Sequence, residues 1–250
     1  MPYNCDVKIM AVKPRRAMVL EMCEQMGLKE NDVVIYDDRP SGGGTLYTCK
    51  KCWKAPAAPG VTHRVVLQDD LFLCDDFINI INRIVNTNPE FIFSLFCSRV
   101  HFEHALPNSP YVIINGWNSW GQGMMMPLRY VKPMFEFADR ELGTDFQYDD
   151  AIYTWWAQQE KIPIATTVPS TIQHRCPTQS TLGYNNKQKI SKVWAGFDLS
   201  NVKWEAKSFA MSPRMPLEVS LEEQKKRIAE KGNKPAYTIF RKGNSNVFDT

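Results

Sequence analysis

The sequence predicts an α/β fold in which a mainly parallel, twisted sheet is flanked by helices and followed by an irregular C-terminal extension. Short apolar strands alternate with amphipathic helices over the first two-thirds of the chain. The 250 residues, 44% of them hydrophobic, are enough to form one large core. Beyond Cys176 the chain becomes polar and then basic. We therefore expect a main domain over residues 1–180 and a basic extension over residues 181–250.

The first elements are strands separated by a helix and a loop. An apolar run over residues 7–12 predicts the first strand, and a helix over residues 15–26 follows until Gly27 stops it. Residues 33–36 and 64–67 are short apolar runs and predict the second and third strands. The Gly-rich segment between them, which leads into a basic stretch ending at Lys54, is expected to be a loop.

The later elements follow from the same periodicities. Residues 115–127 contain three consecutive Met and four Gly or Pro, which is the composition of a loop. The remaining predictions are helices over 76–85, 131–141, 149–161 and 221–231, and strands over 91–97, 111–114 and 164–168.

Composition and charge exclude several classes of protein. A net charge of +3 is too small to indicate a nucleic-acid-binding protein by itself. The seven Cys are an odd number and follow no secretory signal, so we expect a reduced, cytoplasmic protein. The longest apolar-leaning segment, residues 91–97, is too short to cross a membrane. We therefore expect no membrane partner.

Two adjacent carboxylates, Asp69 and Asp70, follow the third predicted strand. Neighbouring like charges at the end of a buried strand repel each other unless a cation or hydrogen-bond donors compensate them. Carboxylate oxygens suit Mg²⁺ or Mn²⁺, so a divalent metal is one interpretation. The alternative is that the two residues cap the following helix.

Polar residues also follow the first two strands. Asp37 and Asp38 come directly after the second strand, where they either contribute to a ligand site or begin a turn. Lys13, Arg15 and Arg16 follow the first strand, and their charge would suit a phosphate. Ligands of parallel sheets bind beyond the carboxyl ends of the strands, so these groups together predict a site at that edge.

This order resembles the nucleotide-sugar-dependent glycosyltransferases of the GT-A fold. In that family a strand ends in acidic residues that hold the nucleoside, and the resemblance assigns this role to Asp37 and Asp38. A later strand ends in an Asp-any-Asp motif that binds ribose and metal. Here the motif reads QDD, with Gln68 in place of its first acid and Asp69 at its centre. The resemblance makes Asp70 the expected metal ligand.

The resemblance continues downstream, covering roughly residues 7–176. The segment GWNSWGQG, with Trp117 and Trp120, is similar to the one that borders donor sugar and acceptor, although its aromatic residues could equally pack in a core. The segment YDDA is similar to the acidic pair that supplies a catalytic base, here Asp149 or Asp150. Asp150 is favoured, because Asp149 could cap the helix. His174, in PSTIQH, resembles the histidine that completes the metal site, or else has a structural role.

The resemblance implies an enzyme that moves a sugar from a nucleotide diphosphate sugar, a UDP-sugar by preference, to an acceptor hydroxyl with inversion. It implies Mn²⁺ or Mg²⁺ as cofactor. Small transferases of this kind also resemble those that bacteriophages use to glycosylate modified pyrimidines in DNA, which would place the protein in the host cytoplasm. A bacterial surface polysaccharide or lipid-linked glycan is the competing acceptor.

Two other classes of function remain open. Cys49 and Cys52 have the spacing of one zinc knuckle, although a second pair is missing. A non-catalytic nucleic-acid-binding protein is the other alternative, because the extension interleaves aromatic residues such as Trp204 with many Lys and Arg. Acidic strand ends argue against it, since without metal they would repel phosphate.

Overall fold

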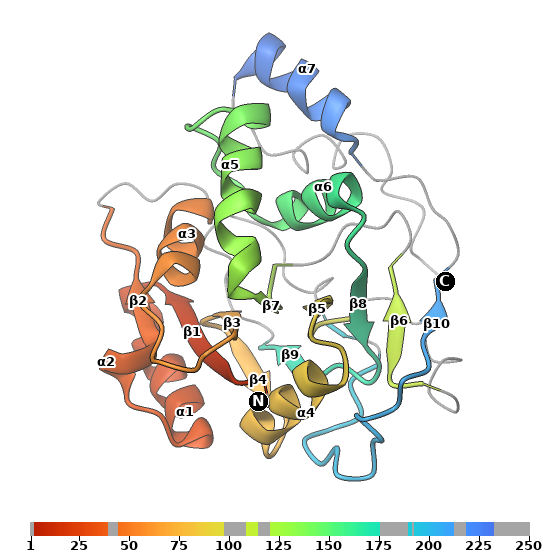
Figure 1. Ribbon diagram of the computed structural model, residues 1–250. Coiled ribbons are helices and arrows are strands. Elements are labelled where there is room, and N and C mark those ends of the chain that lie inside the picture. Colours follow the sequence, from red (N-terminus) through yellow and green to blue (C-terminus); the bar gives the residue numbers. More distant parts are fainter. Residues whose placement is uncertain are drawn as a thin grey trace, which may run out of the picture.

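The computed structural model describes residues 3–39, 45–97, 109–114, 121–175, 190–191, 193–212 and 219–232. Within these residues, eight strands form one sheet in the order β10-β6-β8-β5-β7-β3-β1-β2 (Figure 1). The strands are β1 (Cys5–Ala11), β2 (Val34–Tyr36), β3 (His63–Gln68), β5 (Ile92–Ser94), β6 (Tyr111–Ile113), β7 (Gly123–Pro127), β8 (Ile164–Thr167) and β10 (Ala210–Met211).

The sheet is mostly parallel. β1 pairs in parallel with β2 and β3, β5 with β8, and β10 with β6. β7 runs antiparallel between β3 and β5, and β6 is antiparallel to β8. A second, smaller sheet pairs β4 (Leu71–Leu73) with β9 (Ile172–His174) in antiparallel fashion.

Helices cover both faces of the large sheet, which confirms the predicted fold class. One face packs against α1 and α4, and the other against α3, α5 and α6, as Figure 1 shows. The helices are α1 (Arg16–Met26), α2 (Glu30–Val33), α3 (Leu46–Lys54), α4 (Phe77–Thr87), α5 (Val131–Leu142), α6 (Asp150–Glu160) and α7 (Leu221–Lys231). Along β1, Val7 and Ile9 enter the core under α1 and α4, whereas Met10 enters the core under α3. This is the alternation expected of a strand covered on both faces.

Several predicted boundaries agree closely with the structure. α1 ends where expected, because Gly27 adopts a left-handed conformation with φ of 66° that costs glycine little. α7 covers residues 221–231 as predicted, and the Ser220 side chain caps it by accepting a hydrogen bond from the Glu223 N–H at 3.1 Å.

The prediction of a loop over the three methionines is wrong. Met124, Met125 and Met126 are buried in the interior strand β7. A strand flanked by two others and covered on both faces is apolar throughout, so its composition shows no alternation. Gly123 at its start packs closely, since a Cβ there would lie 2.5 Å from Cδ1 of Ile172 and would force that side chain to move.

The basic stretch that ends at Lys54, for which the sequence predicted no helix or strand, forms helix α3. Its buried face carries Cys49, Cys52 and Trp53, and its lysines lie on the other side. The aromatic residue Trp204 of the extension is fully buried and packs against Tyr111 at a ring separation of 6.2 Å. It is therefore not available to a nucleic-acid surface. In the described part of the chain, no helix is long and apolar enough to cross a membrane.

Candidate functional site at the carboxyl edge of the sheet

Strand register brings the predicted site residues to one edge of the sheet. Ala11, the last residue of β1, lies opposite Tyr36 of β2, and Met10 lies opposite Gln68 of β3. The residues after these three strands therefore meet at the same edge. β7 begins at this edge in the opposite direction, and the backbone N–H of Gln68 donates to the carbonyl of Gln122 at 2.9 Å.

Asp69 and Asp70 are buried at this edge and share one arginine. Nη1 of Arg15 lies 2.7 Å from Oδ1 of Asp69 and 2.8 Å from Oδ2 of Asp70. The backbone N–H of Val12 donates to the other oxygen of Asp69 at 2.8 Å. Burial raises the pKa of Asp69, and the charge of Arg15 opposes this rise. The cap position of the following helix, α4, is occupied by Asp76, so Asp69 and Asp70 do not cap it and instead form a charged cluster with Arg15.

The structure brings the two predicted metal ligands together. His174 lies on β9 opposite Leu71 of β4, and its Nε2 is 3.2 Å from Oδ2 of Asp70. The backbone N–H of Arg175 donates to the carbonyl of Asp70 at 2.8 Å and fixes the two strands side by side. His174 is buried, and its Nδ1 has no hydrogen-bond partner in the structure. Because Nε2 already faces Asp70, Nδ1 is the nitrogen that could contact a further ligand.

The donor set fits a divalent cation that also binds phosphate. Among the described residues, no three His, Cys, Asp or Glu side chains are arranged to hold a metal ion. Mg²⁺ and similar ions are commonly held by one or two carboxylates and complete their shell with substrate phosphates and water. Asp70, with His174 beside it, suits that pattern and would leave coordination positions for a diphosphate.

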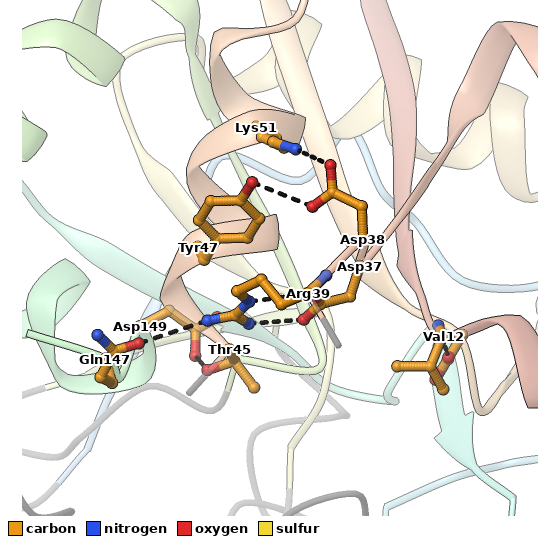
Figure 2. A network of polar contacts seen from close by, with 10 residues as sticks. Val12, Asp37, Asp38, Arg39, Thr45, Tyr47, Lys51, Gln147 and Asp149 are labelled. Atoms are coloured by element: carbon orange, nitrogen blue, oxygen red, sulfur yellow. Dashed lines mark hydrogen bonds and ion pairs between the residues drawn. The ribbon is translucent and has the colours of Figure 1, made fainter. Parts of the chain in front are cut away.

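Asp37 and Asp38 anchor a second polar network (Figure 2). Arg39 donates to both carboxylate oxygens of Asp37, at 3.0 and 2.6 Å, and reaches Oε1 of Gln147 at 3.4 Å. Asp38 accepts from the hydroxyl of Tyr47 at 3.0 Å, and Lys51 contacts its other oxygen at 2.8 Å. The network ties the end of β2 to α3 and to the segment before α6. Oδ1 of Asp37 also accepts from the backbone N–H of Arg39 at 3.0 Å, so the predicted turn forms and is part of this network.

The ion pair with Arg39 predicts how stability depends on pH. The hydrogen bonds from Arg39 lower the pKa of Asp37 from its usual 3.8 to about 2. A depressed carboxyl pKa stabilises the fold above pH 3.8, and this stabilisation is lost as the pH falls toward 2. Asp37→Asn is therefore expected to cost about 1–2 kcal/mol of unfolding free energy at pH 6 and less at pH 3. Urea denaturation at the two pH values measures this difference, and an equal cost at both would contradict the assignment.

Arg16 does not join the site. Its side chain is 61% exposed, and its guanidinium makes a bidentate ion pair with Glu30, with both contacts at 2.8 Å. The hydroxyl of Tyr36 donates to the same carboxylate at 2.7 Å. Of the two arginines predicted to contact phosphate, only Arg15 lies at the acidic cluster.

Asp149 and Asp150 open α6 near the same edge. Asp149 occupies the cap position but makes no capping hydrogen bond. Instead its buried carboxylate accepts from the hydroxyl of Thr45 and lies so close to Gly121 that a Cβ there would be 3.2 Å from Oδ2. Asp150 is less buried, and its Oδ1 accepts from the N–H of Ala151 at 3.1 Å. The sequence argument for preferring Asp150, that Asp149 caps the helix, is therefore wrong. Asp150 is still preferred as the candidate base, because its side chain is more exposed than that of Asp149.

Two predicted residues, Trp117 and Trp120, lie outside the described residues. Gln68 is placed at the end of β3 beside Gln122, whose buried Oε1 has no hydrogen-bond partner in the structure.

Two residues of the polar network in Figure 2, Arg39 and Thr45, were not singled out from the sequence. Arg39 directly follows the two aspartates, so its charge was a usable signal, whereas nothing in the sequence links Thr45 to Asp149.

The zinc alternative for Cys49 and Cys52 finds no support. Both thiols lie in the core below α3, and Sγ of Cys49 is 3.1 Å from the hydroxyl of Tyr153. Burial raises the pKa of Cys52 to about 12 and that of Cys49 well above its usual value. A zinc knuckle needs further ligands, and among the described residues no group of three His, Cys, Asp or Glu side chains is arranged to hold a metal ion.

A cavity of about 480 Å³ lies elsewhere, between α3 and α5. It is lined by Trp53, Lys54, Val131, Phe135 and Asp139 among others. None of the predicted site residues lines it, so the candidate site rests on the strand-end residues and not on this cavity.

No protein-family model and no curated protein matches this chain. Among solved structures, a mutant of Drosophila β-1,4-galactosyltransferase 7 in complex with manganese, UDP-Gal and xylobiose is similar over 74% of this chain and 75% of that chain, with 8% identity and a TM-score of 0.42. A glycosyltransferase involved in glycosylation of the major capsid of PBCV-1 is similar over 69% and 93% of the two chains, with 13% identity and a TM-score of 0.36. The inositol-1-phosphate CTP transferase from T. maritima is similar over 66% of each chain, with 9% identity and a TM-score of 0.35. Likenesses this distant carry no argument about activity.

Proposed function

We propose that this protein is a metal-dependent glycosyltransferase that moves a sugar from a nucleotide diphosphate sugar, UDP-sugar by preference, to an acceptor hydroxyl with inversion. The observation that supports it most is the contact of Asp70 with His174. These residues are 104 positions apart in the chain, and their side chains meet beside Asp69 and Arg15 at the carboxyl edge of the sheet. Ligands of parallel sheets bind at such edges.

The residues of the edge divide the work of binding the donor. Asp37 and Asp38 end β2 and would contact the nucleoside, with Gln68 at the ribose. Arg15 would make charge-assisted hydrogen bonds to the diphosphate. Asp70 and His174 would hold Mn²⁺ or Mg²⁺, which as a Lewis acid stabilises the negative charge that gathers on the leaving diphosphate. Trp117 and Trp120 are proposed to face the sugar.

The acceptor hydroxyl must lose its proton as it attacks the anomeric carbon. Asp150 is proposed as the general base, with Asp149 holding the start of α6 in place through Thr45. A positioned base typically contributes about 10²–10⁴-fold to the rate. Asp150→Asn is therefore expected to lower transfer by about that factor while leaving donor binding unchanged. Transfer to acceptor and equilibrium binding of UDP are the two measurements, and full turnover of the variant would remove Asp150 from this role.

A panel of nucleotide-sugars with Mn²⁺ tests the function as a whole. The expected result is slow hydrolysis of one donor to its nucleotide diphosphate, dependent on Mn²⁺ and absent with EDTA. If no donor in the panel is bound or hydrolysed, the proposal is wrong. This assay needs no knowledge of the acceptor.

For the acceptor we propose a hydroxymethylated pyrimidine in phage DNA, because the extension carries an excess of basic residues. Lys225, Lys226 and Arg227 lie along α7; Lys225 pairs with Glu141 and Arg227 with Glu223, and DNA phosphates would have to compete with these carboxylates. The target base would have to leave the helical stack to reach the edge of the sheet. DNA binding that weakens steeply with salt is the expected result, and its absence would favour a bacterial glycan or a lipid-linked saccharide. DNA binding without any donor hydrolysis would favour a non-catalytic nucleic-acid-binding protein.

A further inference from the structure

Arg15 places one nitrogen between the two carboxylates of the acidic cluster. Its Nη1 is 2.7 Å from Oδ1 of Asp69 and 2.8 Å from Oδ2 of Asp70. The second of these oxygens is also the atom 3.2 Å from Nε2 of His174. A single positive group thus occupies the position from which a cation would contact this cluster.

The fold holds Arg15 in that position. Its side chain is only 12% exposed, and it projects from the short 3₁₀ helix Lys13–Arg15 that connects β1 to α1. Asp69 is fixed from the other side by the N–H of Val12. Two adjacent buried carboxylates need a compensating charge in the protein without ligands, and Arg15 supplies it.

The same arrangement obstructs a metal ion. An ion bound to Oδ2 of Asp70 would lie within a few ångströms of Nη1, and two like charges at that separation in a buried site repel strongly. A guanidinium also pairs well with phosphate, often through two parallel hydrogen bonds. A diphosphate arriving with the ion would therefore offer Arg15 a new partner.

We propose that Arg15 and the divalent cation exclude each other from Asp70, so that the cation is retained only when a diphosphate draws Arg15 away. This inference rests on the proposed function and adds an order to it, in which metal and nucleotide bind together and neither binds tightly alone. Coupling between two ligands is reciprocal, so each must strengthen the binding of the other by the same factor.

The test compares Mn²⁺ binding by the whole protein and by Arg15→Met, followed through the paramagnetic resonance signal of free Mn²⁺. Without nucleotide, Arg15→Met is expected to bind Mn²⁺ at least about tenfold more tightly, which is the effect of losing one charge-assisted competitor. With UDP as the probe, Mn²⁺ affinity is expected to rise in both proteins, because the diphosphate itself binds the ion, and to rise by a larger factor in the unaltered protein, where UDP also draws Arg15 away. Arg83→Met is the matched control, because Arg83, on α4, pairs with Glu205 of the extension and lies outside the cluster.

Thermal unfolding supplies a second readout. Loss of Arg15 leaves two buried carboxylates uncompensated, so the variant should have a lower Tm that Mn²⁺ restores. Neither the unaltered protein nor Arg83→Met should show a rise of that size. Should Arg15→Met fail to fold, Arg15→Gln keeps a hydrogen-bond donor without the charge, and the same increase in Mn²⁺ affinity is expected of it.

The outcomes separate the two proposals. Equal Mn²⁺ affinity of the unaltered protein and both Arg15 variants overturns the exclusion, even where donor hydrolysis depends on Mn²⁺ and Asp70. Absence of Mn²⁺ binding in every protein, with and without UDP, together with absence of donor hydrolysis, overturns both the exclusion and the proposed function.

Discussion

Asp70→Asn is expected to reduce Mn²⁺-dependent donor hydrolysis by at least about 10³-fold, because a Lewis acid contributes several kcal/mol and each 1.36 kcal/mol is tenfold in rate. Oδ2 of Asp70 is the atom on which Arg15 and His174 converge, at 2.8 and 3.2 Å. An amide at this position keeps the shape of the side chain but loses the charge that would hold the cation. Release of nucleotide diphosphate at saturating donor and Mn²⁺ measures the loss.

Two further variants show whether the effect belongs to the site. Asp198→Asn alters an exposed aspartate of the extension and should leave hydrolysis unchanged. His174→Gln should lower the rate less than Asp70→Asn and shift the Mn²⁺ concentration needed for half-maximal rate upward, since one ligand of two is weakened. A variant Asp70→Asn with the rate and Mn²⁺ dependence of the unaltered protein would mean that the ion is bound elsewhere.

The sequence predicts the position of those candidate residues that follow single strands. Asp37 directly follows one apolar run, Asp69 and Asp70 follow another after Gln68, and parallel strands carry their ends to one edge. Arg15 follows from the same reasoning. For these residues, local chemistry and position along the chain are sufficient, because the β-α-β order determines which edge they reach.

The remaining parts depend on pairing between distant segments. His174 reaches Asp70 because β9 pairs with β4, and both strands are three residues long, too short for a recognisable period. β7 was missed because a strand covered on both faces is apolar throughout. The contact of Thr45 with Asp149 joins residues 104 positions apart, which no local pattern reveals. Tertiary packing overrode local composition in each case.

Arg64 carries the second large expected effect, on stability. It lies in β3 with its side chain fully buried, and its guanidinium donates to both oxygens of Asp6 at 2.7 and 2.6 Å. Nη1 also donates to the carbonyls of Cys52, Trp53 and Ala55, at 3.0, 2.9 and 2.7 Å. These carbonyls belong to the C-terminal end of α3, where the helix itself supplies no donors and where a positive charge is favourable. One side chain therefore joins β1, β3 and α3.

Arg64→Met is expected to lower the free energy of unfolding by about 3–5 kcal/mol, because it leaves buried carbonyls and a partly buried carboxylate without their partner. Arg64→Lys should recover only part of this loss, since one ammonium cannot reach Asp6 and the end of α3 at the same time. Arg83→Met, which removes a more exposed pair, should cost no more than about 1 kcal/mol. Urea denaturation at pH 7 measures all three.

The junction of β1, β3 and α3 also bears on the candidate site, because Asp70 follows β3 and Thr45 precedes α3. An Arg64 variant is therefore expected to bind donor more weakly even under conditions in which it is still folded. A cost for Arg64→Met as small as that for Arg83→Met would show that the junction of β1, β3 and α3 is held by apolar packing alone.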